Sequence, residues 1–165
     1  MIKELFTLAK MLFQSKPSDM LGKDLELMFM EHIPFKSFGY MSWCGKVIVR
    51  KEYENVVHEY YNERIKRHEY GHVMQAIYHG DNWLEYYLSY SWNWLKHCPW
   101  IHPSSAVYFF NKYECECYAN DERPKYWKDY DIDNLITKYS IRKPRKIWRE
   151  LGGDVEAWKA YVRTL

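Results

Sequence analysis

The two histidines of His68-Glu69-Tyr70-Gly71-His72 are the feature that most constrains how this chain can fold. On an α-helix, side chains at positions i and i+4 project from the same face, so this spacing predicts two neighbouring imidazoles. The segment from Glu54 to His79 contains no proline, is rich in Glu, Arg, Lys and Tyr, and is followed by Gly80. We therefore expect one long helix over this range.

Both histidines continue a stripe of mostly apolar residues along the expected helix. The stripe follows a three-to-four-residue spacing and comprises Val57, Tyr61, Ile65, His68, His72 and Ala76. Charged residues cover much of the remaining surface, namely Glu63, Arg64, Lys66 and Arg67. This pattern predicts that the two imidazoles face the protein interior.

Two imidazoles in this arrangement can share a metal ion. Zinc accepts neutral histidine nitrogens at about 2.0–2.1 Å, and a catalytic zinc takes three protein ligands and a water molecule. Glu69 lies next to the first histidine and can take a proton from such a water. The motif thus predicts that His68 and His72 bind Zn²⁺ and that Glu69 is a catalytic base.

A third ligand is expected from a second helix packed beside the first. The segment from Asn111 to Asn120 offers two carboxylates, Glu114 and Glu116. Residues two apart on a helix point about 200° away from each other, so only one of the two can face the metal. Spacing alone does not choose between them. The Cys-x-Cys of Cys115 and Cys117 is a further possible ligand source, although Cys117 is more simply a small buried residue.

The two segments together resemble the gluzincin class of zinc metallopeptidases, in which H-E-x-x-H is followed by a helix carrying E-x-E-A-D or E-x-E-A-N. The chain is also similar, over about residues 30–130, to a group of small bacterial proteins with H-E-Y-G-H. The resemblance implies a zincin-like fold, hydrolysis of peptide bonds and a peptide or protein substrate. It implies Glu114 as the third ligand, with Glu116 as the alternative, and it places Tyr118 where Asp or Asn is usual.

The expected fold is α+β and zincin-like, mainly helical, with a small antiparallel sheet or β-hairpin over the metal-binding helix. The hairpin is predicted at Phe38 to Lys51, and either of its arms is a candidate edge for an extended peptide. At 165 residues the chain is expected to form one domain. This domain comprises an N-terminal helix over 1–16, a core over about 24–130 and C-terminal helices over 131–165.

An aromatic segment from Trp83 to Trp100 lies between the two metal-binding segments. Asp81 or Asn82 is expected to cap a helix there that ends near Pro99. Its tyrosines and tryptophans are expected to pack over the metal-binding helix, and contact with a hydrophobic substrate and a position at a membrane interface are the alternatives. Its few basic residues do not form the cationic face of a membrane-surface helix. Candidates for stabilising an oxyanion are His102, Tyr108 and Tyr113, and the sequence does not select one of them.

The overall composition excludes some partners and locations. The net charge of +2 gives no reason to expect nucleic acid, and the basic run is interpreted as a solvated face; it comprises Lys138, Arg142, Lys143, Arg145, Lys146 and Arg149. No secretory signal or transmembrane segment is recognisable, so a cytoplasmic location is expected. The four cysteines lack a secreted-type spacing and are expected to stay thiols.

The sequence therefore predicts a zinc metallopeptidase in which His68, His72 and Glu114 hold the metal and Glu69 activates water. The alternative is a non-catalytic zinc-binding or protein-interaction module that keeps the ligands without an open cleft.

Overall fold

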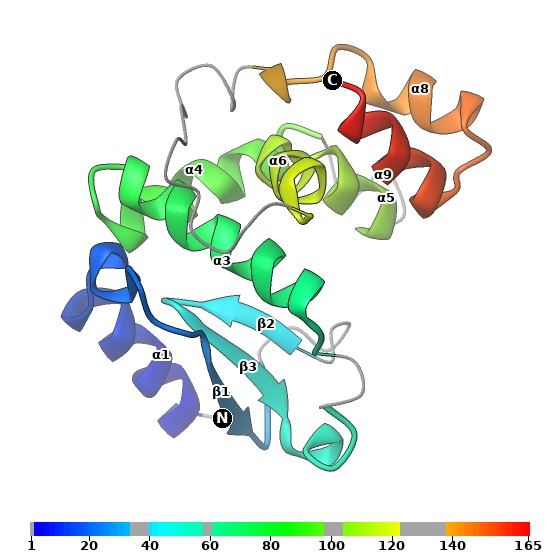
Figure 1. Ribbon diagram of the computed structural model, residues 1–165. Coiled ribbons are helices and arrows are strands. Elements are labelled where there is room, and N and C mark those ends of the chain that lie inside the picture. Colours follow the sequence, from blue (N-terminus) through cyan, green and yellow to red (C-terminus); the bar gives the residue numbers. More distant parts are fainter. Residues whose placement is uncertain (1, 34–39, 58–60, 98–103, 123–137) are drawn as a thin grey trace.

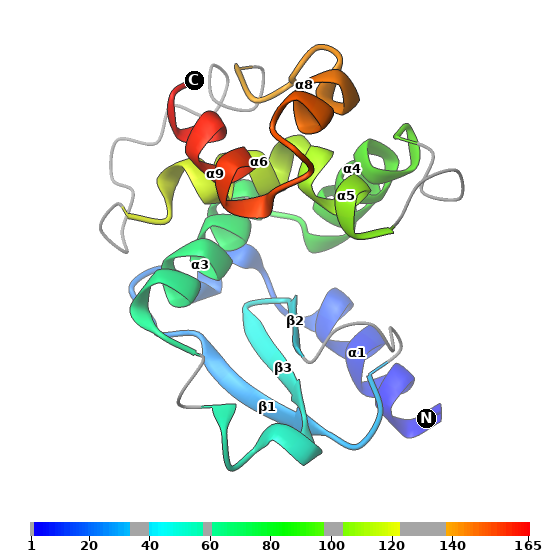
Figure 2. The ribbon, with the colours of Figure 1, turned by 90° about the vertical axis from the view of Figure 1, so that its right-hand side faces the viewer.

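The computed structural model describes residues 2–33, 40–57, 61–97, 104–122 and 138–165. Within these ranges the chain is mainly helical, with one small sheet, which agrees with the expected α+β class. Figures 1 and 2 show the sheet and helix α1 (Ile2–Gln14) at one end of the molecule. Most other helices gather at the opposite end, and α3 (Glu63–Tyr78) lies between the two parts.

The sheet has three strands in the order β1-β3-β2, which are β1 (Glu26–Met30), β2 (Tyr40–Trp43) and β3 (Lys46–Arg50). Strands β2 and β3 are antiparallel and form the predicted hairpin, whereas β1 pairs with β3 in parallel. The prediction of a purely antiparallel sheet is therefore wrong, because a parallel strand from outside the hairpin completes it. Since β3 is central, only the β2 arm of the hairpin lies at an edge. Residues 38 and 39 of the predicted hairpin lie outside the described residues.

Both faces of β3 are covered, which explains its almost continuous apolar sequence. Ile48 points to one face, where it packs with Leu8 of α1, Met30 and Ile33. Val47 and Val49 point to the other face and pack with Val57. Helix α1 ends ahead of Pro17, where the short 3₁₀ helix η1 (Pro17–Met20) begins, as the proline predicts.

Helix α3 carries the H-E-x-x-H motif, but it is shorter than the sequence predicts. It begins at Glu63, because the Asn62 side chain accepts a hydrogen bond from the Ile65 amide (3.1 Å) and so caps the first turn. Lys51–Tyr53 forms a separate 3₁₀ helix, η2, and turns follow it. The prediction of one continuous helix from Glu54 is therefore wrong at residues 54–56, which form turns, and at Tyr61 and Asn62, which precede α3, whereas residues 58–60 lie outside the described residues.

The helical end is formed by α4 (Trp83–Leu95), α5 (Ser104–Phe110), α6 (Lys112–Asn120), α8 (Pro144–Glu150) and α9 (Val155–Arg163). Helix α6 packs between α3 and α9, so it can bring side chains onto the histidine face of α3. Asn82 caps α4 and Asp154 caps α9, and both agree with the sequence. None of the described helices combines the length and the apolar character that crossing a membrane requires.

Candidate metal centre

Helix α3 presents His68 and His72 on its buried face, toward α6 and α4. The two imidazoles lie edge to face, with ring centroids 5.2 Å apart, as the i, i+4 spacing requires. Both side chains and that of Glu69 between them are buried. Buried histidines need polar partners. Their partners come from other helices.

The carboxylate of Glu114 on α6 lies between the two histidines. Its Oε2 is 3.2 Å from Nε2 of His68, and its Oε1 is 3.3 Å from Nε2 of His72. The hydroxyl of Tyr90 on α4 donates a hydrogen bond to the same Oε1 (2.5 Å). Atoms bound to one tetrahedral zinc at about 2.0–2.1 Å are separated by roughly 3.3–3.4 Å. Each of the two distances from Glu114 to a histidine nitrogen is close to this separation.

Glu116, the alternative third ligand, is bonded to a different group. The fully buried Glu116 accepts a hydrogen bond at Oε2 from Nε2 of Gln75 (2.7 Å). Gln75 lies on α3 one turn beyond His72 and is itself 0% exposed. The two glutamates thus diverge as the helical geometry requires, and Glu114 is the one that contacts the histidines.

Gln75 also determines which nitrogen of His72 carries hydrogen. Its Nε2 donates to the Tyr113 carbonyl (2.9 Å) and to Glu116, so its Oε1 faces Nδ1 of His72 (2.9 Å). A carbonyl oxygen only accepts hydrogen bonds, and therefore Nδ1 must be the donor. The hydroxyl of Tyr86 lies 2.9 Å from the same nitrogen. In the neutral imidazole, the lone pair is then on Nε2 and points at Glu114.

A lone pair facing a carboxylate is repulsive unless a cation or a proton lies between them. Burial lowers the pKa of His72, but Cys117 and Glu114 outweigh it and raise that pKa well above its usual value. Burial likewise raises the pKa of Glu114, but the two histidines hold it well below its usual range. The pair of His72 and Glu114 is therefore an environment that favours positive charge between them.

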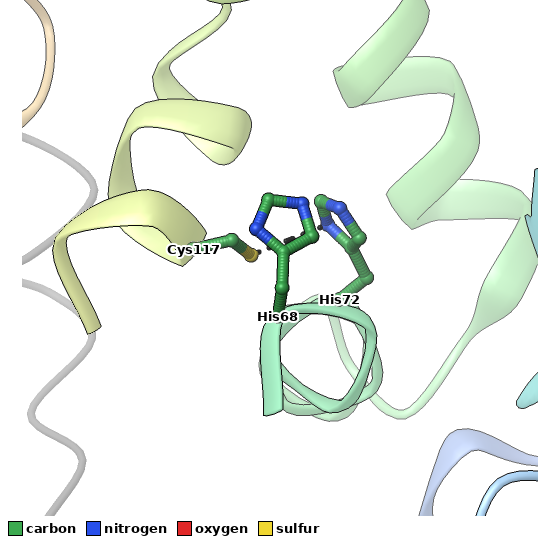
Figure 3. A group of neighbouring side chains, drawn as sticks. All are labelled: His68, His72 and Cys117. Carbon is green, nitrogen blue, oxygen red and sulfur yellow. Dashed lines mark hydrogen bonds between the residues drawn. The ribbon is translucent and has the colours of Figure 1, made fainter. Parts of the chain in front are cut away.

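Cys117 offers a second set of donors with the same histidines. The ligand atoms of His68, His72 and Cys117 all lie within 4.8 Å of one another, so this buried group could hold a metal ion (Figure 3). Its Sγ is 3.5 Å from Nδ1 of His72, on the opposite side of that ring from Glu114. This nitrogen is already engaged by Gln75, and burial raises the pKa of the Cys117 thiol to about 12. A metal ion at this nitrogen would have to displace the hydrogen bond to Gln75.

Glu69 lies at the junction of α3 and the sheet. Burial raises the pKa of Glu69, while the charges of His68 and His72, and then Ser42 of the edge strand β2, act to lower it. Glu69, which the sequence predicts as a catalytic base, is thus a buried carboxylate close to His68 and His72.

Tyr118 takes the position where the resembling families carry Asp or Asn. Its ring packs on the imidazole of His68, with centroids 4.4 Å apart. Nδ1 of His68 has no hydrogen-bond partner among the described residues. His68 is therefore positioned by this ring contact and by Glu114 at Nε2, whereas His72 has hydrogen-bond partners at both ring nitrogens.

The three oxyanion candidates have different outcomes. Tyr108 lies near the site, since burial and then Glu114 raise its pKa well above its usual value. The hydroxyl of Tyr113 lies 2.9 Å from Nε2 of His79, so it is bonded away from the metal-binding histidines. His102 lies outside the described residues.

Helix α4 confirms the predicted packing of aromatic residues over the metal-binding helix. The rings of Tyr86 and Tyr90 lie 6.3 and 6.1 Å from that of His72. Their direct bonds to His72 and Glu114, and the role of Gln75, do not follow from the sequence reasoning. The i, i+4 spacing of the two tyrosines, matching that of the histidines, is a signal that could have identified them.

Cys44, Cys115 and Cys117 are buried free thiols, and Cys98 lies outside the described residues. Comparison of the chain with protein-family models, with curated proteins and with solved structures gave no match.

Proposed function

We propose that this protein is a zinc-dependent metallopeptidase. The observation that carries the proposal is the position of Glu114, which sets one carboxylate oxygen against Nε2 of each histidine of the H-E-x-x-H helix. Two imidazoles, one carboxylate and an adjacent glutamate are the donor set and base of zinc hydrolases. The resemblance to gluzincins agrees with this donor set.

In this proposal, each residue of the site has one role. His68, His72 and Glu114 hold the zinc ion, which when bound supplies Lewis-acid chemistry. Glu69 takes the proton from the attacking water and returns it to the leaving amine, for which its raised pKa is suited. Tyr90 holds Glu114 in place through its 2.5 Å hydrogen bond.

The edge strand β2 supports a peptide as the substrate. Ser42 of this strand is near enough to Glu69 to lower its pKa, so a peptide added along β2 would run close to the base. Strand addition binds the main chain of a peptide through hydrogen bonds that do not depend on its side chains. We therefore expect an extended segment of peptide or protein to be the substrate.

A second candidate function is a non-catalytic metal-binding module. Its supporting observation is burial, since Glu69 and Glu114 are only 5% and 2% exposed. A closed site with protein ligands alone is typical of structural zinc. In that case the metal would contribute to folding and Glu69 would have no chemical role.

Glu69→Gln separates the two functions. For a peptidase, this variant keeps stoichiometric zinc but loses peptide hydrolysis, measured on a mixed peptide library by mass spectrometry. The matched control is Glu63→Gln, which removes an exposed carboxylate of the same helix that pairs with Lys66. Zinc-loaded wild type that cleaves no peptide, or hydrolysis that Glu69→Gln leaves unchanged, would contradict the peptidase proposal.

A further inference from the structure

Helix α1 is apolar on two sides. On one side, Leu8 is buried in the contact with the sheet. Ile2, Phe6 and Phe13 lie outside this contact and are 82%, 73% and 74% exposed. Figures 1 and 2 show α1 at the outer edge of the molecule. Single exposed apolar side chains are common on proteins, but several large ones on one short helix form a patch that indicates an interaction surface.

The exposed apolar residues of α1 form one stripe. At 3.6 residues per turn, Ile2, Phe6, Ala9 and Phe13 fall within roughly 60° of one another around the helix axis. Leu8 lies roughly 130° from the middle of this stripe, so the packing of α1 on the sheet does not use it. The stripe is therefore an apolar face that the core of the protein leaves exposed.

Two lysines border the stripe on one side. Lys3 and Lys10 are exposed and lie roughly 40–60° around the helix from Phe6. Among the described residues, neither lysine takes part in an ion pair. Glu4 is the acidic residue of α1, and its carboxylate accepts a hydrogen bond from the His32 amide (3.1 Å), away from the stripe. The charge beside the stripe is thus positive.

Helix α4 provides an internal comparison. It also exposes a row of apolar side chains, which are Leu84, Leu88, Trp92 and Leu95. Between Trp83 and Leu95, however, the helix has no lysine or arginine, and its one charged residue is Glu85. An anionic surface would repel that carboxylate. Only α1 combines exposed aromatic rings with neighbouring cations, as helices that bind at a lipid surface do.

A second copy of the chain matches the stripe less well. The exposed side chains of Ile2, Leu5, Phe6 and Phe13 offer roughly 500 Å² of apolar surface, whereas a stable dimer buries about 800 Å² on each partner. An antiparallel pair of α1 helices would also place Lys3 of one copy beside Lys10 of the other. Such a contact between like charges is unfavourable.

We propose that α1 docks this protein on an anionic lipid surface. Ile2, Phe6 and Phe13 enter the boundary between headgroups and acyl chains, and Lys3 and Lys10 contact the lipid phosphates. The helix then lies in the plane of the interface, with its apolar stripe toward the lipid and its Leu8 side on the sheet. This docking does not depend on the metal centre or on its chemistry.

Flotation of the whole chain with lipid vesicles tests the proposal. The vesicles are phosphatidylcholine with about 30% phosphatidylserine, at about 0.15 M salt. We expect wild type to bind them, and to bind pure phosphatidylcholine about 30-fold more weakly because two lysine contributions are lost. Phe6→Gln and Phe13→Gln should each weaken binding about tenfold, since each removes an exposed ring. Lys3→Gln and Lys10→Gln should each weaken it about fivefold.

Leu88→Gln is the matched control, because it removes an exposed apolar side chain from α4 and should leave vesicle binding unchanged. The substituted residues are all exposed, so urea unfolding should show the same midpoint in every variant. Absence of wild-type binding to the phosphatidylserine vesicles, or equal weakening by Leu88→Gln, would overturn the proposal. So would equally tight binding to pure phosphatidylcholine, since the lysines would then play no part.

Sedimentation of the protein without lipid tests the second copy as the occupant of the stripe. We expect a monomer whose mass does not change in Phe6→Gln. A dimer that forms in place of vesicle binding, and that Phe6→Gln dissociates, would overturn the proposal and assign the stripe to a contact between copies.

Discussion

Gln75 and His72 lie one helical turn apart on α3, and the side-chain oxygen of Gln75 accepts a hydrogen bond from Nδ1 of His72 at 2.9 Å. The side-chain amide of Gln75 has a fixed orientation. If it were rotated by 180°, its oxygen would face Glu116 and the Tyr113 carbonyl, which are both acceptors. The buried Glu116 therefore acts on His72 through Gln75. It directs Nε2 of His72 toward Glu114, where the proposed metal would bind.

Gln75→Leu should weaken zinc binding by about 10- to 100-fold, because outer partners of a ligating histidine typically contribute that much. Leucine fills a similar volume but leaves His72 Nδ1 with fewer acceptors. Competition against a chromophoric chelator measures the affinity. Tyr86→Phe is the milder comparison, since it removes one hydroxyl at 2.9 Å from Nδ1 and leaves Gln75 in place. An unchanged affinity in Gln75→Leu would contradict this role of Gln75.

Cys117→Ala should retain near-stoichiometric zinc, whereas Glu114→Ala should lose it. The reason is that Glu114 approaches Nε2 of both histidines, while Cys117 approaches the nitrogen of His72 that Gln75 occupies. Metal analysis of protein purified without chelator tests this directly. Cobalt substitution adds a spectroscopic check, since thiolate ligation gives a charge-transfer band that should be absent. Loss of metal in Cys117→Ala with retention in Glu114→Ala would establish the cysteine set instead.

The histidine pair could be predicted from the sequence because its geometry is local to one helix. The choice between Glu114 and Glu116 could not, because it depends on how α6 is rotated about its axis. An amphipathic pattern would reveal that rotation, but every residue from Tyr113 to Cys117 is buried. Only the packing of α6 between α3 and α9 determines which glutamate meets the histidines.

The hairpin could likewise be predicted, since Cys44 and Gly45 form its tight turn, with φ values of 48° and 76°. Strand β1 could not, because its partner β3 lies 20 residues away and its parallel pairing leaves no turn signal in the sequence. The sequence predicts the start of α3 too early, because the charged residues before Asn62 are as compatible with a helix as those after it. The cap decides the boundary.

Asp121→Asn should lower the free energy of unfolding by about 1.5–3 kcal/mol, the range for hydrogen bonds to charged groups. The buried carboxylate of Asp121 accepts hydrogen bonds from Arg64 of α3 (2.7 Å) and Arg163 of α9 (3.2 Å). It thus joins the helices on either side of α6. Both arginines are partly exposed, which keeps the loss below that of a fully buried ion pair.

Urea unfolding followed by circular dichroism measures this loss. Glu122→Gln is the matched control, because Glu122 is a 73% exposed neighbour whose carboxylate is 4.0 Å from the same Arg163. It should change stability by less than about 0.5 kcal/mol. Equal effects of the two variants would show that Asp121 does not join α3 to α9.

His97 should make the protein less stable as the pH falls from about 6.5 toward 4. Burial, aided by Lys96 and Arg145, lowers the pKa of His97 from 6.5 to about 4, so within this window the unfolded chain binds a proton that the folded chain does not. Stability therefore rises with pH through this range and is unaffected by His97 above it. Urea unfolding of wild type and of His97→Asn is measured from pH 4 to 8. The difference between their midpoint urea concentrations isolates the contribution of His97 to stability from that of every other titrating group. The variant should lose less stability on acidification than wild type does. A constant difference across the whole range would mean that His97 titrates alike in the folded and unfolded chain, which would contradict this prediction.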